Sequence, residues 1–183
     1  MIEVRIHGRG GQGAVIASKV LADAVFHEGR CVQSFPSFGV ERRGAPVAAF
    51  TRIDDKPVRL RCQIYHPDHV MVLDPSLMHV VDVTAGLKKG GWVLINSEQQ
   101  PAYFALPAEY RVATVDANAI AIKHRLGPRT APIVNTAILG AFARVSGLVS
   151  LEAVAAAVRQ AVPLKRDDNV AATREAFAAV NTA

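Results

Sequence analysis

Residues 2–26 read IEVRIHGRGGQGAVIASKVLADAVF and contain the signals that decide the fold. The segment Ile2–Ile6 alternates apolar and polar side chains, which is typical of a β-strand with one buried face. A glycine-rich segment, Gly8–Gly13, breaks that alternation, and Ala14–Phe26 then places its larger apolar residues at the spacing of an α-helix. The order strand, glycine loop, helix predicts the first unit of a Rossmann-like α/β domain.

The glycine loop has the chemistry of an anion-binding site. Its glycines form a G-x-G-x-x-G pattern between the expected strand and helix. Glycines there permit positive φ angles and close approach of a ligand, while the free N–H groups at the start of the helix face a phosphate or carboxylate. Arg9 adds a mobile positive charge, and Gln12 adds a neutral donor. The candidate ligand-binding residues are Gly8, Arg9, Gly10, Gly11, Gln12 and Gly13.

Two other interpretations of the loop stay open. The glycines can serve only a tight turn and close packing of the helix on the strand, without any ligand. A dinucleotide site would also need an Asp or Glu at the end of the second strand, where it binds the ribose hydroxyls. Residues 32–36 read VQSFP and contain no acid. This argues against a nicotinamide-dependent dehydrogenase.

The chain after this first unit continues the alternation of strands and helices. Compact apolar runs that predict further strands lie at His69–Leu73, Gly91–Asn96 and Arg111–Val115. Val47–Ile53 and Val58–Leu60 flank a turn and predict an inserted β-hairpin. We therefore expect a Rossmann-like, mostly parallel sheet flanked by helices, with a β-hairpin insertion and a helical C-terminal part, in one domain of residues 1–183.

Residues with good capping side chains mark the helices of the second half. Expected N-caps are Asp116, Asn135 and Ser150, followed by helices at about residues 117–126, 136–145 and 151–162. The side chains of Asn135 and Thr136 are alternatively candidates to reach a cofactor. Asp167 and Asp168 introduce a last helix, because acidic side chains favour the first turn. The C-terminal part is therefore expected to be helical.

Composition and charge narrow the class of protein. The chain has 183 residues, 50% of them hydrophobic, and a formal net charge of +5. It lacks the roughly 20-residue apolar run of a membrane span and a secretory signal pattern, so we expect a cytoplasmic protein without membrane contact. Scattered basic pairs and few aromatic residues argue against nucleic-acid binding. The two cysteines, Cys31 and Cys62, are too few to hold an iron–sulfur cluster.

A second segment, residues 34–46, reads SFPSFGVERRGAP and predicts a binding loop. Arg42 and Arg43 are candidates to hold a carboxylate or phosphate of a cofactor in a bidentate manner, with Glu41 orienting one of them. The alternative is an exposed cluster of ion pairs with little energetic effect.

Several isolated residues have both a functional and a structural interpretation. His7 follows the first strand, where it can donate to a phosphate and titrate near neutral pH, or act as a structural hydrogen bonder. His66 and His69 flank an acid but lack further metal ligands, so a metal site is not expected there. Asp74 and Ser76 follow a strand and are candidates either for ligand contact or for helix capping.

Residues 8–15, GRGGQGAV, residues 33–46, QSFPSFGVERRGAP, and residues 50–53, FTRI, together resemble the gamma subunit of the pyruvate and related 2-oxoacid:ferredoxin oxidoreductases. The strongest part of the resemblance covers about the first third of the chain. Asn169 and Arg174 are similar to polar positions near the C-terminus of that family.

The resemblance implies a subunit of an enzyme complex that oxidatively decarboxylates a 2-oxoacid to acyl-CoA and carbon dioxide. It implies thiamine diphosphate with Mg²⁺ in alpha and beta subunits, and [4Fe-4S] clusters in a ferredoxin-like delta subunit. The external electron acceptor would be ferredoxin, or NAD through a flavin subunit. This chain would hold no cofactor alone, but its glycine loop would contribute to a shared coenzyme A site.

Two rival functions remain at this point. A stand-alone nucleotide-binding oxidoreductase would bind NAD(P) tightly without partners. A non-catalytic scaffold subunit would contact no ligand at all. The 2-oxoacid itself is left open between pyruvate, 2-oxoglutarate, branched-chain and aryl acids, because its pocket would lie mainly in other subunits.

Overall fold

The computed structural model describes residues 1–37 and 42–182. Its strands are β1 (Ile2–Arg9), β2 (Cys31–Pro36), β3 (Pro46–Asp54), β4 (His69–Val72), β5 (Trp92–Asn96), β6 (Arg111–Val115) and β7 (Asn181–Thr182). Its α-helices are α1 (Ala14–His27), α2 (Ala117–Lys123), α3 (Ala137–Ser146), α4 (Leu151–Ala161) and α5 (Arg166–Ala179). Two 3₁₀-helices, Pro75–His79 and Pro101–Phe104, follow β4 and β5.

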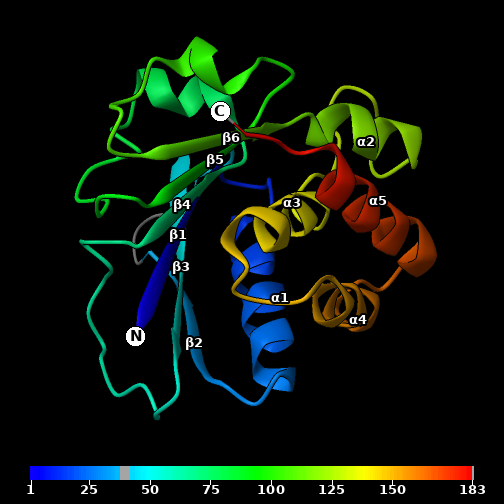
Figure 1. Ribbon diagram of the computed structural model, residues 1–183. Coiled ribbons are helices and arrows are strands. Elements are labelled where there is room, and N and C mark those ends of the chain that lie inside the picture. The colour runs from blue at the N-terminus through cyan, green and yellow to red at the C-terminus, as the bar shows by residue number, and fades with distance from the viewer. Residues whose placement is uncertain (38–41, 183) are drawn as a thin grey trace.

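The strands form one open sheet in the order β2-β3-β1-β4-β5-β6-β7 (Figure 1). The strands β1, β4, β5 and β6 run parallel, with Ile6 of β1 opposite Met71 of β4. The strands on either side of these four differ, because β3 pairs antiparallel with both β1 and β2, and β7 pairs antiparallel with β6. Because these four strands are parallel, their carboxyl ends lie along the same edge of the sheet.

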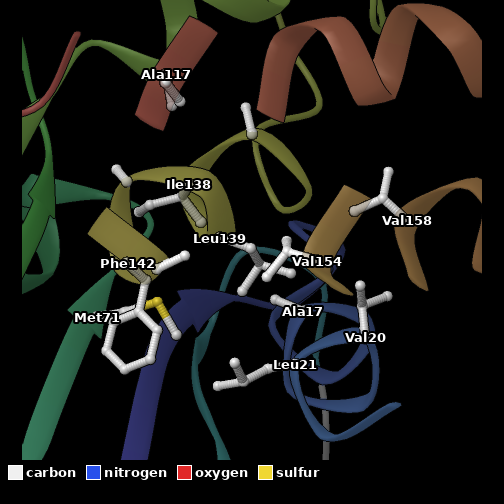
Figure 2. Close-up of a cluster of buried hydrophobic side chains, with 14 of the residues drawn as sticks. Ala17, Val20, Leu21, Met71, Ala117, Ile138, Leu139, Phe142, Val154 and Val158 are labelled. Atoms are coloured by element: carbon white, nitrogen blue, oxygen red, sulfur yellow. The ribbon is translucent and has the colours of Figure 1, made fainter. Parts of the chain in front are cut away.

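Helices α1, α3, α4 and α5 cover one face of the sheet (Figure 1). Inward-facing side chains of β1 and β4 meet them in the main core, where Leu21, Met71, Leu139 and Phe142 are fully buried (Figure 2). Helices α3 and α5 approach so closely that a Cβ atom on Gly140 would lie 1.9 Å from the Thr173 carbonyl oxygen. The C-terminal helices therefore form part of the same core as the first strand and helix.

The opposite face of the sheet has a smaller apolar core and a line of buried polar residues. Val70, Val72 and Ile95 belong to this second core. On β1, the buried Arg5 donates through Nη2 to the carbonyl oxygens of Val83 (2.9 Å) and Ala85 (2.7 Å). These hydrogen bonds fix the connection between β4 and β5 over the sheet.

On the same face of the sheet, a buried arginine of β3 links β1, β2 and the segment that follows β3. The Arg52 side chain is 1% exposed and forms an ion pair with Glu3 of β1, with 2.8 Å between Nε and Oε1. It also donates to Gln33 of β2 and to the Cys62 carbonyl oxygen. A buried arginine is tolerated only when such partners satisfy it, so Arg52 ties residues 62–63 to the sheet.

The expected α/β class with an open sheet and a helical C-terminal part is confirmed. Two details differ. The expected hairpin of Val47–Ile53 with Val58–Leu60 is wrong, because β3 pairs instead with β2 and residues 57–60 form no strand. The sheet is mixed rather than mostly parallel, since three of its strand pairs are antiparallel. Local apolar patterns identify strands but carry no information on which partner a strand selects.

The helix starts follow the capping signals closely, with one exception. The carboxylate of Asp116 accepts from the Ala119 amide (2.8 Å), and the Ser150 hydroxyl accepts from the Ala153 amide (3.1 Å). Asn135 does not cap α3, whose N-cap is Thr136 without a side-chain hydrogen bond. Within residues 1–37 and 42–182, no helix is long and apolar enough to cross a membrane.

Candidate functional site

The glycine loop connects β1 to α1 as the sequence predicts. Gly11 and Gly13 have φ angles of +94° and +83°, a conformation that strongly favours glycine. Gly13 is the N-cap of α1 and provides no capping side chain, and the first backbone bond of the helix runs from the Ala17 amide to the Gly13 carbonyl oxygen (2.9 Å). The N–H groups of the first helical turn are therefore left without helical acceptors, which is the feature that attracts anions.

The segment with the arginine pair packs directly on this loop. The Gly10 amide donates to the Ala45 carbonyl oxygen (2.8 Å), and the Gly44 amide donates back to the Gly10 carbonyl oxygen (3.0 Å). Gly10 and Arg43 also form an isolated parallel bridge. A Cβ atom on Gly10 would lie 2.3 Å from the Arg42 carbonyl oxygen, so only glycine permits this contact. The structure thus joins two segments that the sequence identified separately.

Arg9 is held in place, which corrects the expectation of a mobile charge. Its Nε atom forms an ion pair with Asp74 Oδ2 at 2.8 Å, and its Nη2 atom donates to the Ser76 hydroxyl at 2.7 Å. Its Nη1 atom donates to the Gly44 carbonyl oxygen at 3.0 Å. Arg9 therefore ties the glycine loop to the segment after β4 and to the arginine segment.

Gln12 and Asp74 complete this arrangement. Gln12 accepts from the Arg9 amide through Oε1 (2.7 Å) and donates to Asp74 Oδ2 through Nε2 (3.2 Å). Burial opposes ionisation of Asp74, but the hydrogen bonds from Ser76, Arg9 and Gln12 outweigh it and lower the pKa of this carboxyl. An ionised Asp74 compensates the charge of Arg9. Asp74 also caps the following 3₁₀-helix by accepting from the Ser76 amide, which confirms the capping interpretation of this segment.

The arginine pair remains at the surface beside the loop. Arg42 and Arg43 are exposed, and neither forms an ion pair with a carboxylate among the residues that the structure describes. The Arg43 side chain passes close to Gly11, with its Cγ atom 4.0 Å from an ideal Cβ position there. The predicted orienting role of Glu41 lies outside the described residues. The positive charge next to the glycine loop therefore comes from Arg42 and Arg43 rather than from Arg9.

His7 is not placed to titrate near neutral pH. The residue is 8% exposed, and burial, assisted by the neighbouring Arg5 charge, lowers the pKa of the imidazole from 6.5 to about 4. Its Nε2 atom has no hydrogen-bond partner among the described residues. His7 is therefore neutral at pH 7. Farther along, His69 accepts from the Trp92 amide (3.2 Å), which gives it a structural role.

Sequence reasoning missed how Asn135 contacts the loop. Its Nδ2 atom lies 3.5 Å from the Gly13 carbonyl oxygen, and a Cβ atom on Gly13 would come within 2.3 Å of that nitrogen. Asn135 and Gly13 are 122 residues apart in the chain. Local patterns therefore could not predict the contact. Asn169 is equally buried and accepts from the Thr136 hydroxyl (2.8 Å), whereas Arg174 forms an exposed pair with Glu152.

Two cavities extend from the site along the carboxyl ends of the parallel strands. One of about 640 Å³ is lined by Ser76, Met78, Tyr103 and Phe104 among others. Another of about 430 Å³ lies beside Asn96 and Asp116. Open α/β sheets bind ligands at this edge. Because the Ser76 hydroxyl also accepts from Arg9, the larger cavity adjoins the glycine loop.

Comparison with known proteins identifies the family of the chain. The model of the pyruvate ferredoxin/flavodoxin oxidoreductase family matches residues 3–179. The chain is 55% identical over 181 residues to the common gamma subunit of the pyruvate/ketoisovalerate oxidoreductases of Thermococcus kodakarensis, a match that covers 97% of this chain and 96% of the relative.

Solved structures show the same fold. The crystal structure of pyruvate oxidoreductase subunit PORC from Thermotoga maritima has a TM-score of 0.85 and 34% identity, covering 100% of this chain and 98% of that chain. A 2-oxoglutarate:ferredoxin oxidoreductase from Magnetococcus marinus has a TM-score of 0.75 at 17% identity, covering 97% of this chain and 30% of that much longer chain. The chain belongs to the pyruvate ferredoxin/flavodoxin oxidoreductase family, as the gamma subunit of a 2-oxoacid oxidoreductase complex.

Proposed function

We propose that this chain supplies the phosphate-binding part of a coenzyme A site within its complex. The site consists of the loop Gly8–Gly13 and the pair Arg42 and Arg43, and neighbouring subunits complete it. The observation that carries the proposal is the contact at Gly10, where the arginine segment bonds to the loop on both sides. It joins a helix N-terminus to two exposed cations, a combination that suits the phosphates of coenzyme A.

Each part of the loop has a separate role in this proposal. The N–H groups of residues 14–16, in the first turn of α1, and the two exposed arginines contact the phosphate oxygens. Arg9, Gln12 and Asp74 act as positioning residues, because their mutual hydrogen bonds fix the loop. The cavity beside Ser76 offers room for a further part of the coenzyme. The Magnetococcus marinus enzyme, which shares the fold, has coenzyme A and succinyl-CoA bound in its structure.

The remaining chemistry is assigned to partner subunits. We propose that alpha and beta subunits hold thiamine diphosphate and Mg²⁺, and that a ferredoxin-like delta subunit holds the [4Fe-4S] clusters and passes electrons to an external acceptor. The full sequence has only Cys31 and Cys62, whereas one [4Fe-4S] cluster needs four cysteines. Coenzyme A would take up the acyl group, which makes its binding by this chain relevant to turnover but not to decarboxylation.

The test is an arginine replacement in the purified complex. Arg42→Ala together with Arg43→Ala should raise the coenzyme A KM roughly tenfold or more, because each removes a charge-assisted contact with phosphate. The 2-oxoacid KM and the subunit composition should not change. The measurement is coenzyme-A-dependent reduction of a viologen dye under anoxic conditions.

The matched control is Arg59→Ala, since Arg59 is also exposed but lies between β3 and β4, away from the loop. A scaffold role without ligand contact predicts an unchanged coenzyme A KM in the double variant, and that result would refute the proposal. Tight binding of NAD by the isolated chain would instead support the rival nucleotide-dependent enzyme.

A further inference from the structure

A further concave surface lies beside the start of α1, next to the end of the glycine loop. This cavity of about 580 Å³ lies between α1, residues 125–135 and the connection from α4 to α5. Three aliphatic side chains on it are widely exposed, namely Ile16 (50%), Ile133 (49%) and Leu164 (77%). Clusters of exposed apolar side chains in soluble proteins mark interaction surfaces.

The walls of the cavity hold strained backbone in a fixed arrangement. Arg125 and Lys165 line it and have φ angles of +55° and +52°, which is costly for residues with a Cβ atom. The Lys165 ammonium group donates to the Arg125 carbonyl oxygen at 2.5 Å, and Asn169 donates to the Lys165 carbonyl oxygen at 2.9 Å. These two hydrogen bonds hold Arg125 and Lys165 in their strained backbone conformation. A rigid concave surface binds a partner with little loss of conformational freedom.

The cavity also has an unsatisfied polar group. Asn135 lines it and is 4% exposed, and its Oδ1 atom has no hydrogen-bond partner among residues 1–37 and 42–182. A buried acceptor without a donor costs about 1–3 kcal/mol. Because this oxygen is closed to solvent, an incoming N–H group would pair with it only after the Asn135 amide turned toward the cavity.

The charge of the lining selects the type of partner. Its charged residues are Arg125 and Lys165, and the described lining includes no Asp or Glu. Neither cation forms an ion pair with a described carboxylate. A partner that places a carboxylate at this rim would gain two favourable charge contacts, and one with a lysine or arginine there would be repelled.

We propose that this surface binds a segment of another subunit of the same oxidoreductase complex, one with aliphatic side chains next to an acidic residue. A peptide segment offers the two things that the surface lacks: apolar area for Ile16, Ile133 and Leu164, and a carboxylate for the cations. Because Leu164 is 77% exposed, a small molecule inside the cavity would leave it uncovered. The inference rests on the subunit character of the chain. Because the cavity adjoins the start of α1 and the glycine loop, its test must also follow the coenzyme A KM.

The first test measures assembly of the complex with a charged residue in the apolar rim. Leu164→Glu and Ile133→Glu, each co-expressed with the partner subunits, should weaken retention of this chain about tenfold or more, because they place a carboxylate against apolar and acidic groups. The control is Phe26→Glu, at a site that is 63% exposed near the end of α1 and outside the cavity. Circular dichroism of the isolated variants checks that they fold.

The second test uses hydrogen exchange of the unmodified chain. Amides of residues 126–133 and 162–165 should exchange more slowly in the complex than in the isolated chain. Lys165→Gln should weaken assembly at low salt more than at high salt, since salt screens the ion pair that it removes. Unchanged assembly of Leu164→Glu with unchanged exchange would overturn the inference. A raised coenzyme A KM in a fully assembled Leu164→Glu complex would do the same, because the cavity would then serve the small ligand.

Discussion

Gly10 is the residue at which the two parts of the candidate site meet. Gly10→Ala should destabilise the protein by about 2–3 kcal/mol, because the new methyl group would lie 2.3 Å from the Arg42 carbonyl oxygen and force residues 42–45 away. Gly29→Ala is the control, since Gly29 has positive φ but nothing within 4 Å of a Cβ position. Chemical denaturation measures both. Equal losses of stability in the two variants would show that the contact at Gly10 is adaptable.

The residues of the glycine loop also show which features can be predicted from the sequence and which cannot. The type and position of the loop were predictable, because glycine spacing and the change in apolar period are local signals. The partner of Arg9 was not predictable. Asp74 lies 65 residues away in sequence and meets Arg9 only because β1 and β4 are neighbours in the sheet. Pairing of strands that are distant in sequence is decided by the packing of the whole core.

At the scale of elements, the close contact between α3 and α5 should reverse the usual effect of a glycine-to-alanine replacement on stability. In an open helix position, replacing glycine by alanine adds about 1 kcal/mol of stability. Gly140→Ala should instead cause a net loss of about 2 kcal/mol, because its Cβ atom would lie 1.9 Å from the Thr173 carbonyl oxygen and separate the two helices. Thermal denaturation checks this, and a more stable variant would contradict the close packing.

For the whole molecule, the buried histidine on β1 makes global stability depend on pH. The unfolded chain protonates His7 near pH 6.5, whereas the folded chain does so only near 4. Between these values the unfolded state binds more protons, so the free energy of unfolding should fall by about 3 kcal/mol as the pH falls through this window. Burial also lowers the pKa of His69, which adds to the effect in the same direction.

Denaturation curves at pH 7, 5.5 and 4 test this dependence, with His7→Gln as the comparison. The variant should lose the larger part of the slope between pH 6.5 and 4. The carboxyls with lowered pKa values, such as Asp74 and Glu175, act in a separate window below about pH 4, where protonation removes their stabilising contacts. An identical slope in the variant and the unmodified chain would mean that His7 is not the group responsible.

The sequence by itself determined the α/β class, the position of the glycine loop, the starts of most helices and the resemblance to the gamma subunits. The fold class, the loop and the helix starts follow from patterns within about 20 residues, where periodicity, capping and glycine conformations act, and the resemblance follows from the motifs of residues 8–53. Only the tertiary structure decided that Arg43 meets Gly10, that Asp74 holds Arg9, and that β3 pairs with β2. It also gathered Ile16, Ile133 and Leu164 around one cavity. Such contacts join separate segments of the chain, and they form only when the sheet and helices pack together.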